Sequence, residues 1–148
     1  MELYEKIYLY RRLVSAKCYI DEHYAEGLNL DEIADQAHFS KFHFIRLFKA
    51  IYGFTPGNYL IKTRMEHARL HLANGHSVLE SGYKVGLESP TSFAAMFRRF
   101  VGCSPSAYQK QAIARKLKME QSPLQFVPNC FAESHGWIKS NIGETGVG

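Results

Sequence analysis

The stretch that decides the fold is FIRLFKAIYGFTPGNY, residues 44–59, because a second stretch, FAAMFRRFVGCSPSAY, residues 93–108, repeats its pattern. The two stretches align at a constant separation of 49 residues. Spaced identities of uncommon residue types at one period indicate a supersecondary unit that is used twice. The matching pairs are Phe44 with Phe93, Phe48 with Phe97, Gly53 with Gly102, Pro56 with Pro105, and Tyr59 with Tyr108.

Outward from the first stretch, the pattern predicts a helix, a turn and a second helix. Asn29 and Ser40 are suitable N-caps for the two helices, since both types accept hydrogen bonds from free backbone N–H groups. Gly53 suits the left-handed position after the second helix. The helical spacing predicts buried faces made of Leu30, Ile33, Ala34 and Ala37, then Phe44, Leu47, Phe48 and Ile51.

The second unit follows the same plan, with Ser89 as N-cap, Pro90 at the first helical position and Gly102 at the end. Its first helix is expected from Ser77 to Val85 and aligns with the first unit at 48 residues, so its turn is one residue longer. Gly82 lies in the middle of that helix, which costs about 1 kcal/mol relative to Ala. We therefore expect the second lobe to be the less stable. The predicted buried face is Phe93, Met96, Phe97 and Phe100.

Two further helices complete the predicted fold. A long helix is expected from Thr55-Pro56 to about Ala73, and Asn74-Gly75 ends it. A leading helix from about Glu5 to Tyr24 shows 4-3-4 spacing of Leu9, Leu13, Ala16 and Ile20. No stretch alternates with period two for long enough to indicate a strand.

The expected fold class is therefore all-α, with two helix-turn-helix lobes of homeodomain-like type joined by a long linker helix. The expected boundaries are about 5–54 for the first lobe, 55–74 for the linker helix and 76–110 for the second lobe. Residues 111–148 form a C-terminal extension of unknown role. Phe126, Phe131 and Trp137 are too apolar for a free linker, so we expect the extension to pack on the helical body.

Charge is distributed unevenly along the chain, whose net charge is +4 over 148 residues. Residues 1–40 hold four Lys/Arg against eight Asp/Glu, whereas residues 41–110 hold ten against three. A basic zone in a folded chain is typical of a phosphate-binding surface, and an ordinary solvated face is the alternative. The sequence has no 18-residue apolar run and no export signal at its start, so no membrane association and a cytoplasmic location are expected.

Residues that could carry catalysis or hold a metal are few. Cys18, Cys103 and Cys130 are far apart and are expected to be free thiols. His67 and His71 have helical i, i+4 spacing, but no third ligand completes a metal motif. The chain also lacks a Gly-rich phosphate loop and a catalytic acidic pair. We therefore expect no cofactor, no metal and no enzymatic activity.

The second helix of each unit is the candidate DNA reader, because an α-helix fits the major groove of B-DNA. In the first unit the outward face would present Phe42 and Ile45 to thymine methyl groups and Arg46 to guanine O6 and N7. Lys41 and Lys49 are placed to bind phosphates. The alternatives are burial of the two apolar residues against a neighbouring helix and a structural salt bridge for Arg46.

In the second unit the position equivalent to Arg46 is Ala95. This helix can offer hydroxyl and methyl contacts but no long hydrogen-bonding side chain at that position, so we expect it to position the protein more than it specifies sequence. Its candidates are Thr91, Ser92 and Ala95 for bases, and Arg98 and Arg99 for phosphates.

These motifs resemble the AraC/XylS family of bacterial transcription regulators. The resemblance covers about Ile20 to Tyr108 and includes LDEIADQAHFSKFHFIRLFK (30–49), YGFTPGNYLIKTRMEHARLHL (52–72) and FRRFVGCSPSAY (97–108). It implies two recognition helices in successive major grooves, roughly 34 Å apart. It also implies sequence-specific binding of double-stranded DNA, transcription regulation and RNA polymerase as a partner. By motif position, the family's base-reading sites fall on the six base-reading candidates named above.

The chain departs from the family pattern at Ser81-Gly82, where members usually have Ile-Ala, and at Ala95, where a longer polar or basic side chain is usual. Both departures predict weaker sequence reading by the second lobe. About 20 residues precede the match, as in the family's small stand-alone activators or in a fragment of a longer protein, and the Met1 start favours the former. Two other functions stay open: a DNA-modifying, repair-type enzyme that uses these units for targeting, and a protein-interaction module. The oligomeric state is also open.

Overall fold

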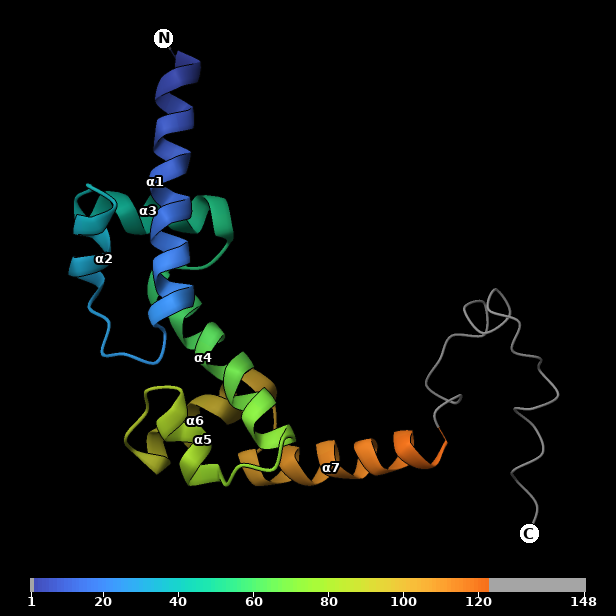
Figure 1. Ribbon diagram of the computed structural model, residues 1–148. Helices are drawn as coiled ribbons and strands as arrows, with labels where there is room; N and C mark the ends of the chain where they lie inside the picture. The colour runs from blue at the N-terminus through green and yellow to red at the C-terminus, as the bar shows by residue number, and fades with distance from the viewer. Residues whose placement is uncertain (1, 123–148) are drawn as a thin grey trace, which may run out of the picture.

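The computed structural model describes residues 2–122 of the chain, and within that range every regular element is an α-helix (Figure 1). The predicted all-α fold is confirmed. The helices are α1 (Glu2–His23), α2 (Leu30–Gln36), α3 (Lys41–Tyr52), α4 (Pro56–Ala73), α5 (Val78–Lys84), α6 (Pro90–Val101) and α7 (Pro105–Gln121).

The helices form two lobes with separate hydrophobic cores, and α4 runs from one to the other (Figure 1). The first core lies among α1, α2 and α3, and it takes Leu60 from the start of α4. The second core lies among α4, α5 and α6, and it takes Met65, Ala68 and Leu72 from the rest of α4. Because one continuous helix supplies both cores, neither lobe is complete without it.

Side-chain caps begin most of these helices, as the sequence indicates. The side chains of Asn29, Thr55, Ser77, Ser89 and Ser104 each accept a hydrogen bond from a backbone N–H in the following first turn. Ser40 occupies the N-cap position of α3, but its side chain makes no cap hydrogen bond. Gly53 and Gly102 end α3 and α6 with φ of 78° and 93°, values in the left-handed region that glycine adopts without strain.

The predicted inward face of α3 and α6 is correct for its central residues and wrong at its end. Phe44, Phe48, Phe93 and Phe97 are fully buried. The last members of the two patterns, Ile51 and Phe100, are each 41% exposed and belong to neither core. Both lie in the final turn, where Tyr52 and Val101, one position later, pack against the cores instead.

The departures at Ser81-Gly82 have a local packing explanation. Both residues are buried, and a β-carbon on Gly82 would lie 3.2 Å from the ring of Phe93. Glycine therefore gives the Phe93 ring room that an alanine would restrict. The Ser81 hydroxyl is buried and has no hydrogen-bond partner within the described residues.

Helix α7 is fixed to the second lobe at its start and extends away from the body beyond it (Figure 1). The Gln109 side-chain amide donates hydrogen bonds to the carbonyl oxygens of Leu72 (3.0 Å) and His76 (2.6 Å), so it anchors α7 to the end of α4. The helix continues without a break past residue 110, where the sequence analysis placed the end of the second lobe. The expected packing of Phe126, Phe131 and Trp137 concerns residues outside the described range. Among the described helices, none is both long enough and apolar enough to span a membrane.

Candidate nucleic-acid interface

The outward face of α3 carries the residues that the sequence selects as base readers. Phe42 is 79% exposed, so it is not packed against a neighbouring helix. Arg46 is exposed and Ile45 is half-buried one position before it. The burial of Phe44 and Phe48 fixes the rotation of the helix and turns this opposite face outward.

The cations of α3 differ in their surroundings. Within residues 2–122, Arg46 and Lys49 are exposed and form no ion pair, so the structural salt bridge considered for Arg46 is not found there. Lys41 is different, since its Nζ lies 3.1 Å from a carboxylate oxygen of Asp31 on α2. A neighbouring carboxylate partly neutralises this candidate phosphate ligand, which the sequence pattern did not indicate.

The outward face of α6 presents small side chains followed by cations. Thr91, Ser92 and Ala95 are all exposed, as are Arg98 and Arg99 near the end of the helix. The backbone N–H of Ser92 donates to the Ser89 hydroxyl in the N-cap, which leaves the Ser92 side chain outside that bond. The structure thus brings all five candidates of the second unit to one exposed surface.

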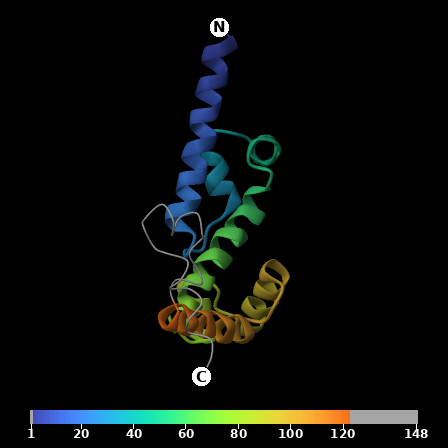
Figure 2. The same cartoon turned by 90° about the vertical axis from the view of Figure 1, so that its right-hand side faces the viewer.

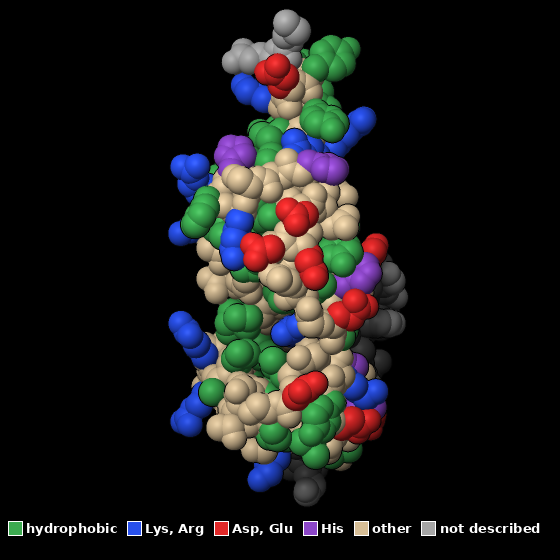
Figure 3. All heavy atoms as spheres, turned by 90° about the vertical axis from the view of Figure 1, so that its left-hand side faces the viewer, with side chains coloured by type: hydrophobic (Ala, Val, Ile, Leu, Met, Phe, Trp, Pro, Cys, Tyr) green, Lys and Arg blue, Asp and Glu red, His purple; other side chains and the backbone are tan. Residues whose placement is uncertain are grey.

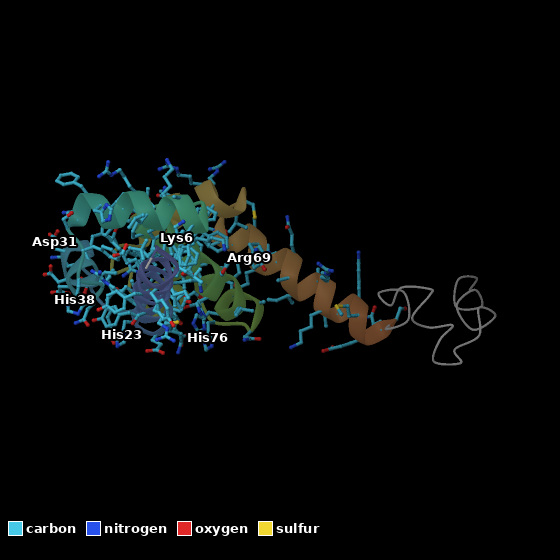
Figure 4. The ribbon with its side chains drawn as sticks, turned by 90° about the horizontal axis from the view of Figure 1, so that it is seen from above. Lys6, His23, Asp31, His38, Arg69 and His76 are labelled. Carbon is cyan, nitrogen blue, oxygen red and sulfur yellow. The ribbon has the colours of Figure 1, made fainter. Side chains whose placement is uncertain are left out.

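The two candidate recognition helices, α3 and α6, lie on the same side of the molecule. In Figure 4, α3 and α6 run along the upper edge, and nitrogen-tipped side chains point away from the body there. In Figure 2 the same helices lie at the right-hand edge, one above the other, and α4 runs from below α3 down and away to the left. Figure 3 views the molecule from the opposite side, where Lys and Arg gather at the left edge and the acidic side chains lie mainly away from it. The candidate interface is therefore one positively charged side that both lobes share.

The turn between α2 and α3 is held by a residue of α1 that the sequence analysis did not select. The Arg12 guanidinium donates hydrogen bonds to the carbonyl oxygens of Ala37 and His38, and it lies 3.9 Å from the centroid of the Phe39 ring. His38 has a left-handed backbone, with φ of 56°. An arginine in a predicted amphipathic helix gives no sequence signal for this role, because its partners are main-chain oxygens 25 and 26 residues away.

A second set of polar contacts joins α1 to the start of α4. The Tyr59 hydroxyl donates to Asp21 at 2.6 Å, and Lys17 pairs with the other oxygen of the same carboxylate at 2.8 Å. The hydrogen bond to Asp21 raises the pKa of Lys17, while burial raises the pKa of Tyr59. Both groups therefore keep their ordinary protonation state, and the contact stays intact, throughout the neutral range.

Comparison with known proteins identifies the same region of the chain as a helix-turn-helix domain. A family model for a helix-turn-helix domain matches residues 33–111, which is more than half of the chain. AarP of Providencia stuartii, a helix-turn-helix-type transcriptional activator, is 32% identical over 92 residues, covering 62% of this chain and 68% of that protein. AdaA of Bacillus subtilis, named a bifunctional transcriptional activator/DNA repair enzyme, is 29% identical over 105 residues, covering 70% of this chain and 47% of that protein.

Two solved structures match the fold of both lobes together. The DNA-binding domain of AdpA, determined with a target DNA, superposes with a TM-score of 0.66 and 32% identity, covering 70% of this chain and 94% of that one. A regulator with an AraC-type DNA-binding domain from Chromobacterium violaceum gives 0.64 and 26%, covering 69% and 92%. The chain spans only 31% to 37% of the length of three other curated relatives that it matches.

Proposed function

Since the chain belongs to the AraC/XylS family of helix-turn-helix transcription regulators, we propose that it binds double-stranded DNA in a sequence-specific way through α3 and α6. One observation carries the proposal: the exposed faces of both helices lie on a single cation-rich side (Figures 2 and 4). A rigid body with this arrangement can place two helices in successive major grooves of one duplex.

Helix α3 is the main reader of base sequence in this proposal. Arg46 is free to make two hydrogen bonds to a guanine, the commonest specific contact in the major groove. Phe42, which is 79% exposed, and Ile45 beside Arg46 are apolar groups that thymine methyls can cover. The clustering of an unpaired arginine with exposed apolar side chains is what distinguishes this face from an ordinary solvated one.

Helix α6 positions the protein more than it specifies sequence. Thr91, Ser92 and Ala95 offer only short side chains, so their reach toward base edges is small. Arg98 and Arg99 would contact phosphates at the far end of the helix, as Lys49 would on α3. Lys41 is a weaker phosphate ligand than the sequence suggests, since it already forms an ion pair with Asp31.

The regulatory role follows from the family alone. We infer that DNA binding by this chain controls transcription in the cytoplasm, with RNA polymerase as the partner, and that the chain performs no catalytic step of its own. The repair-type alternative would require a reactive thiol, and it is tested by exposing the protein to a mild alkylating agent or to damaged duplex. Stoichiometric alkylation of Cys130 would favour that alternative.

Selection of bound sequences from a random duplex library tests the proposal directly. We expect the recovered duplexes to share one well-defined half-site, read by α3, and one loosely constrained half-site about one helical turn away. Affinity for the selected duplex should fall steeply as salt rises, because phosphate contacts release counterions. Recovery of no common sequence, together with binding that salt does not weaken, would favour a protein-interaction module instead.

A further inference from the structure

The segment that follows α1, residues Tyr24, Ala25 and Glu26, lies between the two lobes, and we call it the 24–26 bridge. Arg64 of α4 donates two hydrogen bonds to it, from Nε to the Tyr24 carbonyl oxygen (2.7 Å) and from Nη2 to the Glu26 carbonyl oxygen (2.8 Å). Burial lowers the pKa of Arg64, because both acceptors are neutral main-chain oxygens that replace water only in part. A partly desolvated cation thus ties the end of α1 to the middle of the linker helix.

The middle residue of the bridge touches the second lobe. Gly86, in the turn between α5 and α6, has φ of 83°, and a β-carbon on it would lie 2.5 Å from the Ala25 carbonyl oxygen. Any larger residue would therefore push the two segments apart. Gly86 lies in the short turn that leads into α6, which begins at Pro90. Its contact with the bridge therefore helps to set the position of the start of α6.

The side chain of Tyr24 adds a third connection. Its ring stacks on that of His67 in α4, with centroids 4.1 Å apart and planes inclined by 7°. Among the described residues, Tyr24 is the one that packs against both hydrophobic cores. The bridge is therefore wedged between the first lobe, the linker helix and the turn of the second lobe.

Helix α4 packs into both cores and so fixes the distance between the lobes, but it is one line of attachment, about which bending and twisting change their relative orientation. A second connection, displaced sideways from the helix, removes that freedom. We propose that the 24–26 bridge fixes the orientation of α6 relative to α3, with Arg64 and Gly86 as its positioning residues, so that it sets which spacing of two DNA half-sites the protein accepts. The part of this inference that concerns DNA rests on the proposed function, whereas the part that concerns lobe orientation does not.

The first experiment measures lobe orientation without DNA. Spin labels are attached to Cys18 on α1 and Cys103 after α6 in the full chain carrying Cys130→Ser, and the distance distribution is measured by double electron–electron resonance. Arg64→Met should broaden the distribution, and Gly86→Ala should shift its mean. Arg69→Met is the matched control, because Arg69 also lies on α4 but contacts Tyr108 of the second lobe. The same distribution in all four proteins would overturn the inference.

The second experiment measures the tolerance for half-site spacing. One base pair is inserted between the two half-sites of a selected duplex, which rotates and displaces the second half-site. We expect the insertion to weaken binding of the unaltered protein by about tenfold and of Arg64→Met by about threefold or less, while affinity for an isolated first half-site stays equal. An equal penalty in both proteins would overturn the spacing role.

The two experiments distinguish a failure of the proposed function from a failure of the inference about lobe orientation. If no duplex is bound by any variant, the proposed function fails, and the distance measurement still decides whether the bridge orients the lobes. Circular dichroism checks that each variant is folded. If Arg64→Met does not fold, Arg64→Lys, which keeps the charge but not the two-pronged donor, replaces it and should give an intermediate distribution.

Discussion

His38 and Gly86 lie at the same point of the two helix-turn-helix turns, 48 residues apart, and both have a left-handed backbone with φ of 56° and 83°. Their surroundings differ. The carbonyl group of His38 receives a hydrogen bond from Arg12, whereas the α-carbon of Gly86 faces the carbonyl oxygen of Ala25. The first turn tolerates a side chain at this position and the second does not.

This difference predicts unequal effects of alanine at the two positions. His38→Ala should change the free energy of unfolding by less than about 0.5 kcal/mol, because the strained conformation already exists there and the side chain is exposed. Gly86→Ala should cost at least about 1–2 kcal/mol for the left-handed backbone, with the contact against Ala25 adding to it. Urea unfolding of both variants measures the two costs. A loss for Gly86→Ala no larger than the backbone cost of about 1–2 kcal/mol would mean that the Ala25 contact adjusts freely, and a loss as small as that of His38→Ala would contradict the prediction.

Arg46→Ala should weaken binding to the selected duplex by about 1–3 kcal/mol and should relax the preference at one base position, because a bidentate contact to guanine is lost. Lys49→Ala on the same helix is the matched control. It should weaken all sequences alike and reduce the salt dependence by about one phosphate contact. The measurement is a repeated selection with each variant. An unaltered sequence preference after Arg46→Ala would show that this residue does not read bases.

Asp31→Asn should strengthen DNA binding modestly, since it releases Lys41 from a carboxylate 3.1 Å away. Both side chains are largely exposed, so the ion pair itself contributes about 0–1 kcal/mol. Asp35→Asn removes the same charge from the same helix without freeing Lys41, and it should have the smaller effect on affinity and on the salt dependence. Equal effects of the two changes would indicate that general charge, and not the release of Lys41, governs binding.

Ser81→Ala should raise the free energy of unfolding by about 1 kcal/mol, because it removes a buried hydroxyl that lacks a partner and adds helix propensity to α5. Ser77→Ala in the same segment is the contrasting change. The Ser77 hydroxyl accepts a hydrogen bond from the Glu80 N–H at 3.1 Å as the N-cap, so its loss should cost about 1 kcal/mol. Thermal unfolding distinguishes the two. Destabilisation by Ser81→Ala would point to a polar partner for that hydroxyl.

The helices and their ends could be predicted from the sequence because the signals there are local. The spacing of Phe44 and Phe48, the caps at Asn29 and Ser89 and the glycine at residue 53 each act within a few residues of where they are read. The repeat supplied a second, independent set of these signals, since the buried phenylalanines and the helix-ending glycine of the first lobe have counterparts in the second.

The features that sequence reasoning missed depend on contacts between distant segments. The contact of Gly86 with Ala25, the two bonds from Arg64 to the 24–26 bridge and the hold of Arg12 on the first turn all involve main-chain oxygens. Main-chain oxygens carry no residue type, so no pattern of letters identifies them as partners. The exposure of Ile51 and Phe100 has a related cause, because periodicity shows which face of a helix turns inward but not which of its positions the distant segments cover.

Helix α1 begins well before the matched region, residues 33–111, yet it supplies Leu13, Ala16 and Ile20 to the first core and Arg12 to the first turn. A polypeptide trimmed to the matched residues would keep every residue proposed to contact DNA, but it would lose the helix that covers one side of the first core and supports α3. The segment that matches the family model, residues 33–111, is therefore shorter than the segment that folds as one unit, because that unit includes α1. A chain of residues 33–111 alone should therefore contain the proposed DNA-contacting residues but hold α3 less rigidly, because the first core lacks its α1 residues.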